Sequence, residues 1–182
     1  MRTLFFIPFI ILSIFLTSCV SLNNPFKSRS SIEIKEGYLS LKKINENLDK
    51  QMPLTQKVGS NGIKIVSVTT FASKDSKSLI IEVEFIFTSF EIPEGLPAIA
   101  RFKSSLKYIP KTKEFVFDYI SIIEINFLKE ELLEYVSPQQ KKFINDTLIL
   151  KLSDLVLHKS KKALKPMKSF SVKEGKIKIL FK

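Results

Sequence analysis

The sequence is poor in the residue types that build most catalytic and metal sites. Its 182 residues include one cysteine, one histidine, five glycines and no tryptophan. The single thiol, at Cys19, excludes an internal disulfide and a cluster of thiolate ligands. The only histidine, His158, stands beside lysines and is predicted to be a surface residue rather than a base or a metal ligand.

Catalytic motifs are missing as well. The few glycines form neither a glycine-rich phosphate loop nor a nucleophile elbow. The neighbouring carboxylates Glu130, Glu131 and Glu134 fall in a predicted helix, and we interpret them as solvated charges. We therefore expect no enzyme activity, no catalytic residue, no metal and no other cofactor.

The N-terminal residues have the order of charge and hydrophobicity that is typical of a secretory signal. Arg2 precedes an apolar run over residues 4–16 that is interrupted only by Ser13. This run is shorter than the roughly 20 residues that span a bilayer. Small residues follow it. The pattern predicts a signal peptide over residues 1–18.

The segment Leu16–Cys19 resembles the bacterial lipoprotein box, which is a leucine followed by small residues and a cysteine. This resemblance implies that the thiol of Cys19 receives a diacylglycerol, that residues 1–18 are removed, and that the new amine is acylated. Stable anchoring takes more than one acyl chain, and three chains provide it. The alternative is a transmembrane anchor with an incidental cysteine.

The residues around the anchor and the net charge bear on location and partners. Val20 and Ser21 lack the aspartate that retains enterobacterial lipoproteins in the inner membrane, so we expect the outer membrane, facing the periplasm. The formal charge of +11 favours contact with anionic lipid head groups. An exported protein is not expected to meet nucleic acid. Because the lysines are scattered, compositional drift also explains the charge, and no protein partner is indicated.

The remaining sequence indicates one domain behind a tether. Residues 19–31 comprise the lipidated cysteine and a flexible segment rich in serine and asparagine, and residues 32–182 form a single domain without an internal repeat. Alternation over Ile32–Lys35 predicts a short strand. Apolar residues at helical spacing from Leu41 to Met52 predict a short N-terminal helix that ends at Pro53.

Four long segments follow in which apolar and polar residues alternate. Alternation of this length predicts an antiparallel meander with one covered face, and the strand lengths imply strong curvature. The predicted strands span residues 62–72, 78–90, 98–109 and 114–127. In the fourth, the residues predicted to face inward are Phe115, Phe117, Tyr119, Ile123, Ile125 and Phe127.

A helix is predicted to cover the apolar face. Ser137 and Pro138 suit the N-cap and first turn of a long helix that extends to about residue 156. A shorter helix is predicted over residues 128–135, and a closing strand over residues 172–181. The apolar stripe of the long helix comprises Phe143, Ile144, Leu148, Leu152, Leu155 and Val156.

The domain from Ile32 onward resembles the YceB-like family of bacterial lipoprotein domains, which has no assigned activity. The resemblance covers the opening strand and helix, the four long strands, the long helix and the closing strand. Its most specific part is the segment Val172–Gly175 followed by Ile177, Ile179 and Phe181. No catalytic residues come with these structural motifs.

That family is similar to the tubular lipid-binding (TULIP) superfamily. The similarity implies an α+β fold in which a long, highly curved antiparallel sheet wraps around a long C-terminal helix, with a short helix near the N-terminus. It also implies that the space between helix and sheet takes a lipid or another apolar ligand. The connection near residues 157–167 is short in this chain, and this bears on the size of the ligand.

Two functions remain open from the sequence. One is a tethered protein that binds or shuttles a lipid or another apolar ligand in a groove between helix and sheet. The other is a structural or interaction lipoprotein with a fully packed core, which is what aromatic stripes at strand spacing commonly form, and with a basic surface for a partner. The predicted groove residues are Phe85, Phe87, Phe102, Phe115, Phe117, Phe127, Leu148 and Leu152.

Overall fold

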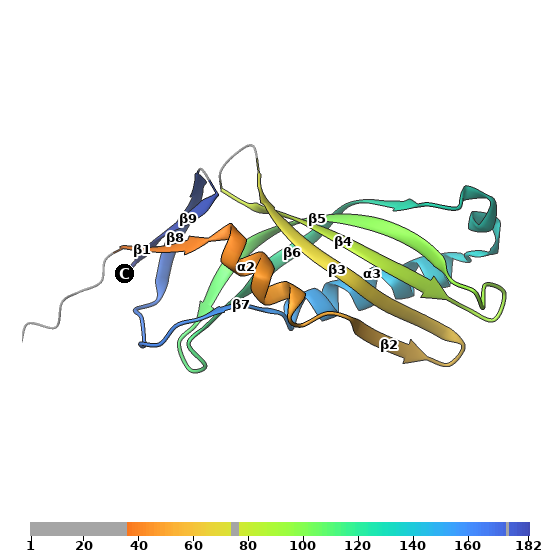
Figure 1. Cartoon of the computed structure of the whole chain (residues 1–182), viewed down its shortest axis with the longest axis horizontal. Helices are drawn as coiled ribbons and strands as arrows, with labels where there is room; N and C mark the ends of the chain where they lie inside the picture. Colours follow the sequence, from red (N-terminus) through yellow and green to blue (C-terminus); the bar gives the residue numbers. More distant parts are fainter. Residues whose placement is uncertain (1–35, 74–76, 174) are drawn as a thin grey trace, which may run out of the picture. The chain divides into compact units, whose positions relative to one another are not determined.

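The strands form two separate antiparallel sheets. A computed structural model describes residues 36–73, 77–173 and 175–182, which belong to one compact unit, Ile34–Lys182. The predictions for residues 1–18, Cys19, the tether and the strand Ile32–Lys35 lie outside the described residues. The sheets have the strand orders β1-β9-β8 and β2-β3-β4-β5-β6-β7 (Figure 1). With two α-helices in the described part of the chain, the fold is α+β.

The elements follow one another in a simple order along the chain. They are β1 (Glu36–Ser40), α2 (Leu41–Asp49), β2 (Leu54–Val58), β3 (Asn61–Ala72), β4 (Leu79–Thr88), β5 (Leu96–Ile109), β6 (Glu114–Phe127), the 3-10 helix η1 (Glu130–Tyr135), α3 (Pro138–Ser153), β7 (Val156–Lys159), β8 (Met167–Lys173) and β9 (Lys176–Phe181).

The predicted meander is confirmed as β3 to β6, which pair in sequence order. Their inward faces form the core: on β4 the buried residues alternate from Leu79 to Phe87, and on β5 they alternate from Leu96 to Tyr108. The strand β2, which pairs with the first part of β3, was not predicted. It is short and three of its five residues are exposed, so it lacks the strong alternation of its neighbours.

The helix α3 begins at the predicted residues. The hydroxyl of Ser137 accepts a hydrogen bond from the backbone N–H of Gln140 at 3.3 Å, and the side chain of Gln140 accepts one from the N–H of Ser137 at 2.8 Å. This capping box satisfies two N–H groups that the first turn leaves free. The helix ends at Ser153 rather than near residue 156, because Val156–Lys159 forms β7 and pairs with β6.

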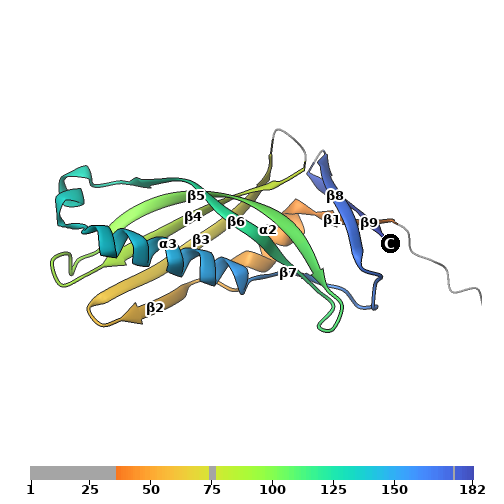
Figure 2. The same ribbon diagram turned by 180° about the vertical axis from the view of Figure 1, so that it is seen from behind.

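One face of the six-stranded sheet carries α3 (Figure 2). The helix packs against β6 and also against β3, which are separated in the sheet by β4 and β5. Four of its side chains are buried, namely Ile144, Thr147, Leu148 and Leu152. Three strands follow α3, so it is not the last element of the chain.

Side-chain amides of α2 and of the turn that follows it in the sequence hold this helix near both edges of the six-stranded sheet. Asn45 donates to the carbonyl of Thr70 on β3 at 3.2 Å and accepts from its N–H at 2.9 Å. Gln51 donates to the carbonyl of Val156 on β7 at 2.9 Å and accepts from its N–H at 3.1 Å. These bonds satisfy backbone groups of β3 and β7, so α2 is fixed between the two strands.

The predicted closing strand is a hairpin. The chain runs through β8, turns at Gly175 with a φ of 72°, and returns as β9 between β8 and β1. A glycine suits this turn because other residues rarely adopt a positive φ. The apolar residues at every second position of β9, Ile177, Ile179 and Phe181, are all buried, as the alternation within a half-buried strand requires.

Two irregularities in the pairing of β5 with β6 change which side chains of β6 face inward. The register shifts after Arg101 and again after Lys103, and Tyr119 has a positive φ of 48°. Tyr119 is 85% exposed and Ile123 is 52% exposed, so the inward orientation predicted for both is wrong. A β-bulge adds one unpaired residue and moves the side chains that follow to the opposite face.

Candidate functional site

Seven of the eight predicted groove residues lie together in the hydrophobic core. Phe127 is the exception: it is half-buried, and its ring contacts Phe85 edge to face at 6.4 Å between ring centroids. Side chains buried in this way form an ordinary packed core, which leaves little empty volume. A space large enough for a ligand therefore has to lie beside this cluster rather than within it. The buried seven are Phe85, Phe87, Phe102, Phe115, Phe117, Leu148 and Leu152.

The second half of β6 has one open edge. β7 pairs with β6 only at Glu114, Phe115 and Val116. Beyond these residues, no other strand of the described chain pairs with that edge of β6. Because α3 packs against β6, apolar side chains of β6 beside this edge lie next to the helix without being enclosed by a further strand.

A pocket of about 390 Å³ lies between β6, η1 and α3. Its volume falls within the range of about 300–1,000 Å³ that is usual for small-molecule sites, and five of its seven lining residues are apolar, as in such sites. We call it the seam pocket. It is lined by Ile122, Ile125, Phe127, Leu133, Lys141, Ile144 and Asn145.

The three β6 residues of the seam pocket face the same side because of the bulge at Ile123. Ile122 pairs with Phe102, Ile125 with Ala100 and Phe127 with Ala98, and the β5 partners are all buried. Without the bulge, Ile122 would face away from Ile125. Sequence reasoning found Phe127 but missed Ile122, because strict alternation assigns Ile122 to the outer face.

Two polar side chains of α3 belong to the same pocket. The Oδ1 atom of Asn145 is buried and has no hydrogen-bond partner among the described residues. Lys141 lies four residues earlier, which places both side chains on one side of the helix, and it is exposed. Since a buried acceptor without a partner costs free energy, a ligand that offers a hydrogen-bond donor to Asn145 gains a partner there.

The first turn of α3 is fixed to the end of the sheet beside the seam pocket. The side-chain amide of Gln140 donates to Asn61, the first residue of β3, at 3.3 Å and to Glu91 in the β4–β5 connection at 3.5 Å. Glu91 also accepts from the hydroxyl of Ser89 at 2.9 Å. Hydrogen bonds from the backbone and from Ser89 hold the pKa of Glu91 below its usual value.

Exposed apolar side chains occur in the segments at this same end of the sheet (Figure 1). Phe90 in the β4–β5 connection is 83% exposed, and Leu128 and Tyr135, before and within η1, are exposed as well. Single exposed apolar residues are ordinary. Here they flank elements that border the seam pocket.

Neither a metal site nor a membrane-spanning helix is indicated in the part of the chain that the structure describes. Within residues 36–73, 77–173 and 175–182, no three histidine, cysteine or acidic side chains come together as a metal site. In the same residues, no helix has the length and hydrophobicity needed to cross a bilayer. A scan of the chain against models of known protein families found no match, and a search of the curated proteins found none either.

Proposed function

We propose that this chain is a lipid-anchored protein of the bacterial cell envelope whose domain holds a lipid or a similar apolar molecule in the seam pocket. The observation that carries the proposal is the pocket of about 390 Å³ beside the open edge of β6. Its apolar lining gains free energy when it is removed from water, by about 25 cal/mol per Å². The open edge offers a way in for a chain-like ligand.

The arrangement of α3 and the sheet supports a TULIP-like fold for this domain. In a flat sheet a helix that lies along β6 is remote from β3, yet α3 packs against both. A sheet that curves around the helix accounts for this, and the bulges in β5 and β6 increase local bending and twist. Membership of the YceB-like family is part of the proposal, and the sequence resemblance supports it.

A second function is favoured by one observation. Seven of the predicted groove residues are buried in the core, as in a structural lipoprotein that needs no internal ligand. In that case the basic surface contacts an envelope partner. Some of its lysines are already engaged: Lys159, for example, pairs with Glu114 at 3.0 Å.

The anchor is tested separately from the pocket. We expect Cys19→Ala to abolish both acylation and removal of residues 1–18, because the thiol is the acceptor of the diacylglycerol. Metabolic labelling with an alkyne fatty acid measures the acylation, and fractionation of the envelope tests the outer-membrane location. Label that persists in the variant would contradict the role of Cys19.

Photo-crosslinking in cells tests the pocket with the full chain. A benzoylphenylalanine replaces Phe127, which lines the seam pocket, and a matched variant carries it at Tyr119, an exposed aromatic residue of the same strand. We expect irradiation to attach apolar molecules of lipid mass at position 127 and not at position 119. Mass spectrometry of the purified chain identifies the adducts.

The outcomes separate the two functions. Adducts of lipid mass at position 127 that exceed those at position 119 support ligand binding. Equal amounts at both positions indicate contact with bulk membrane and overturn the proposal. Crosslinks to a protein through the basic surface, with no small adduct at position 127, favour the structural alternative.

A further inference from the structure

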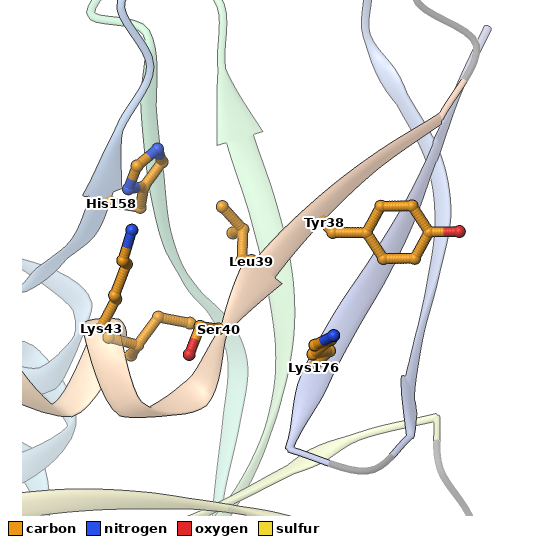
Figure 3. A pocket seen from close by; sticks show the side chains of 7 residues that line it. Tyr38, Leu39, Ser40, Lys43, His158 and Lys176 are labelled. Carbon is orange, nitrogen blue, oxygen red and sulfur yellow. The ribbon is translucent and has the colours of Figure 1, made fainter.

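A second pocket, of about 500 Å³, lies where β1 continues into α2, close to β7 and β9. Its chemistry differs from that of the seam pocket because two lysines and the only histidine of the chain take part in its lining (Figure 3). We call it the basic pocket. It is lined by Tyr38, Leu39, Ser40, Lys43, Ile44, His158 and Lys176.

Two of these groups face each other. The ammonium group of Lys43, from α2, extends toward the imidazole of His158, from β7 (Figure 3). His158 is half-buried rather than a fully exposed surface residue. Burial, and then the positive charge of Lys43, lowers the pKa of His158. Two groups that repel each other when both are charged are held together here.

A negative charge that would relieve this repulsion is not supplied by the described residues. Among them, no aspartate or glutamate lines the basic pocket, and neither Lys43 nor His158 forms an ion pair. The net charge of +11 raises the positive potential further. An anion placed between Lys43 and His158 converts a repulsive pair into two attractive contacts.

Other donors contribute less to the space between these two groups. The N–H of Leu41, the first residue of α2, donates to the carbonyl of Gly175 at 2.9 Å. The hydroxyl of Ser40 makes no capping hydrogen bond to the helix, and it points away from the ammonium group of Lys43 (Figure 3). Lys176 from β9 and the ring of Tyr38 lie on the other side of β1, away from His158 (Figure 3).

An apolar space continues from the basic pocket. A smaller pocket of about 160 Å³ shares Tyr38, Leu39 and His158 with it. Beyond these residues it is lined mainly by apolar side chains, including Phe115 and Phe181. The ring of Phe115 lies 6.0 Å from the imidazole of His158, measured between centroids. A molecule bound between Lys43 and His158 therefore has an apolar cavity within reach.

We infer that the basic pocket binds a phosphate monoester that carries an apolar substituent. The phosphate lies between Lys43 and His158, and the substituent enters the smaller pocket along Leu39. A phosphate presents several acceptor oxygens and up to two negative charges, and so matches the ammonium group of Lys43 and the imidazole of His158 at once. A soluble phosphate monoester and the head group of phosphatidic acid share this chemistry.

The only histidine makes the test direct. The full chain is labelled with ¹³C-histidine and placed in phosphatidylcholine nanodiscs made with an unlabelled scaffold, and it carries no histidine tag. The single imidazole signal then belongs to His158. We expect butyl phosphate to shift this signal in a saturable way. Inorganic phosphate should bind at least tenfold more weakly, because burying about two methylene groups is worth tenfold in affinity.

Two further measurements show whether the phosphate comes from a membrane lipid or from a soluble ester. Nanodiscs that contain phosphatidic acid shift the signal without added ligand if the site takes a membrane head group. If only soluble butyl phosphate shifts it, the ligand is a free ester. Butanol carries the chain without the anion and is expected to leave the signal unchanged.

Matched lysine variants complete the test. Lys43→Gln removes a cation of the pocket, whereas Lys42→Gln removes the neighbouring exposed lysine of the same helix, which does not line the pocket. We expect at least a tenfold loss of butyl phosphate affinity in the first variant and less than a twofold change in the second. Equal losses in both, an equal response to butanol, or equal affinity for inorganic phosphate would overturn the inference. The crosslinking experiment at Phe127 tests the seam pocket, so its outcome does not depend on any of these results.

Discussion

The seam pocket and the basic pocket belong to the same compact unit but are built in opposite ways. The seam pocket is enclosed by apolar side chains of β6, η1 and α3, with Lys141 as its only charged residue. In the basic pocket Lys43, His158 and Lys176 take part, while Leu39 and Ile44 supply the apolar surface. The first is suited to ligands that leave water, and the second to ligands that carry negative charge.

The two pockets arise from different features of the fold: the seam pocket from the six-stranded sheet alone, and the basic pocket from elements of both sheets. The seam pocket exists because β7 is short and leaves most of one edge of β6 without a strand. The basic pocket exists because the chain turns sharply from β1 into α2 and brings Lys43 opposite β7. Apolar burial depends weakly on salt, whereas attraction between exposed charges is screened over about 8–10 Å. Salt should therefore weaken binding only in the basic pocket.

The largest effect is expected where the seam pocket borders the core. Leu148 on α3 is fully buried, and Leu148→Ala should lower the free energy of unfolding by about 2–5 kcal/mol, because it removes buried methyl groups and leaves a cavity. Urea unfolding read by pulse proteolysis measures the loss. Leu150→Ala, at an exposed position of the same helix, is the control and should change stability by less than about 0.5 kcal/mol. A small loss at Leu148 would show that the helix is not packed on the sheet.

The second-largest effect is expected from a charge placed on one or the other face of β6. Ile122 lines the seam pocket and is 40% exposed, so Ile122→Asp should be tolerated by the fold. The carboxylate is costly to desolvate, and we expect about a tenfold loss of the lipid adduct at position 127. Ile123→Asp introduces the same charge one residue further on, outside the pocket, and should leave the adduct unchanged. Equal losses would show that β6 does not present Ile122 to the ligand.

Part of this fold was predictable because long alternation and capping are local signals. The strands β3 to β6, the start of α3 at Ser137 and the buried face of β9 all follow from such patterns. Short or half-exposed strands were missed: β2, β7 and β8 owe their existence to pairing with distant partners. The ends of α2 and α3 were placed too late, since helical spacing persists in the residues beyond Asp49 and Ser153.

The sites were harder to predict than the fold. Phe127 was identified as a groove residue, but Ile122 depends on a bulge that period-two reasoning cannot place. The proximity of Lys43 to His158 brings α2 next to β7, which lies far away in the sequence, and no local sequence pattern predicts it. His158 was consequently predicted to be an ordinary surface residue. Both pockets are formed by contacts between segments that are distant in the sequence, whereas sequence patterns mainly indicate the structure of residues close together in the chain.

A smaller effect concerns the polar wall of the seam pocket. Asn145→Leu removes the buried Oδ1 that lacks a hydrogen-bond partner, so we expect the free energy of unfolding to rise by about 1 kcal/mol. At the same time, adducts at position 127 should shift away from molecules with hydrogen-bond donors. Pulse proteolysis and mass spectrometry measure the two changes. A clear loss of stability would mean that Asn145 makes bonds needed by the fold, and it would remove its proposed contact with the ligand.

The smallest effect tests the electrostatics of the basic pocket through pH. Burial and Lys43 lower the pKa of His158 from 6.5. The folded state therefore binds fewer protons than the unfolded state between the lowered pKa and about 6.5, and stability falls as the pH falls through this window. The charged groups that line the pocket with His158 are Lys43 from α2 and Lys176 from β9.

Removing the nearest of these charges should raise the pKa of His158 toward its usual value. We therefore expect Lys43→Gln to reduce the loss of stability between pH 7 and pH 5, and Lys42→Gln to leave it nearly unchanged. Glu91 and Glu114 do not interfere in this window, because hydrogen bonds lower the pKa of each below 4.5. Titration of the single imidazole signal measures the pKa directly. If its midpoint is the same in both variants, Lys43 does not act on His158, and the two pockets differ in shape rather than in charge.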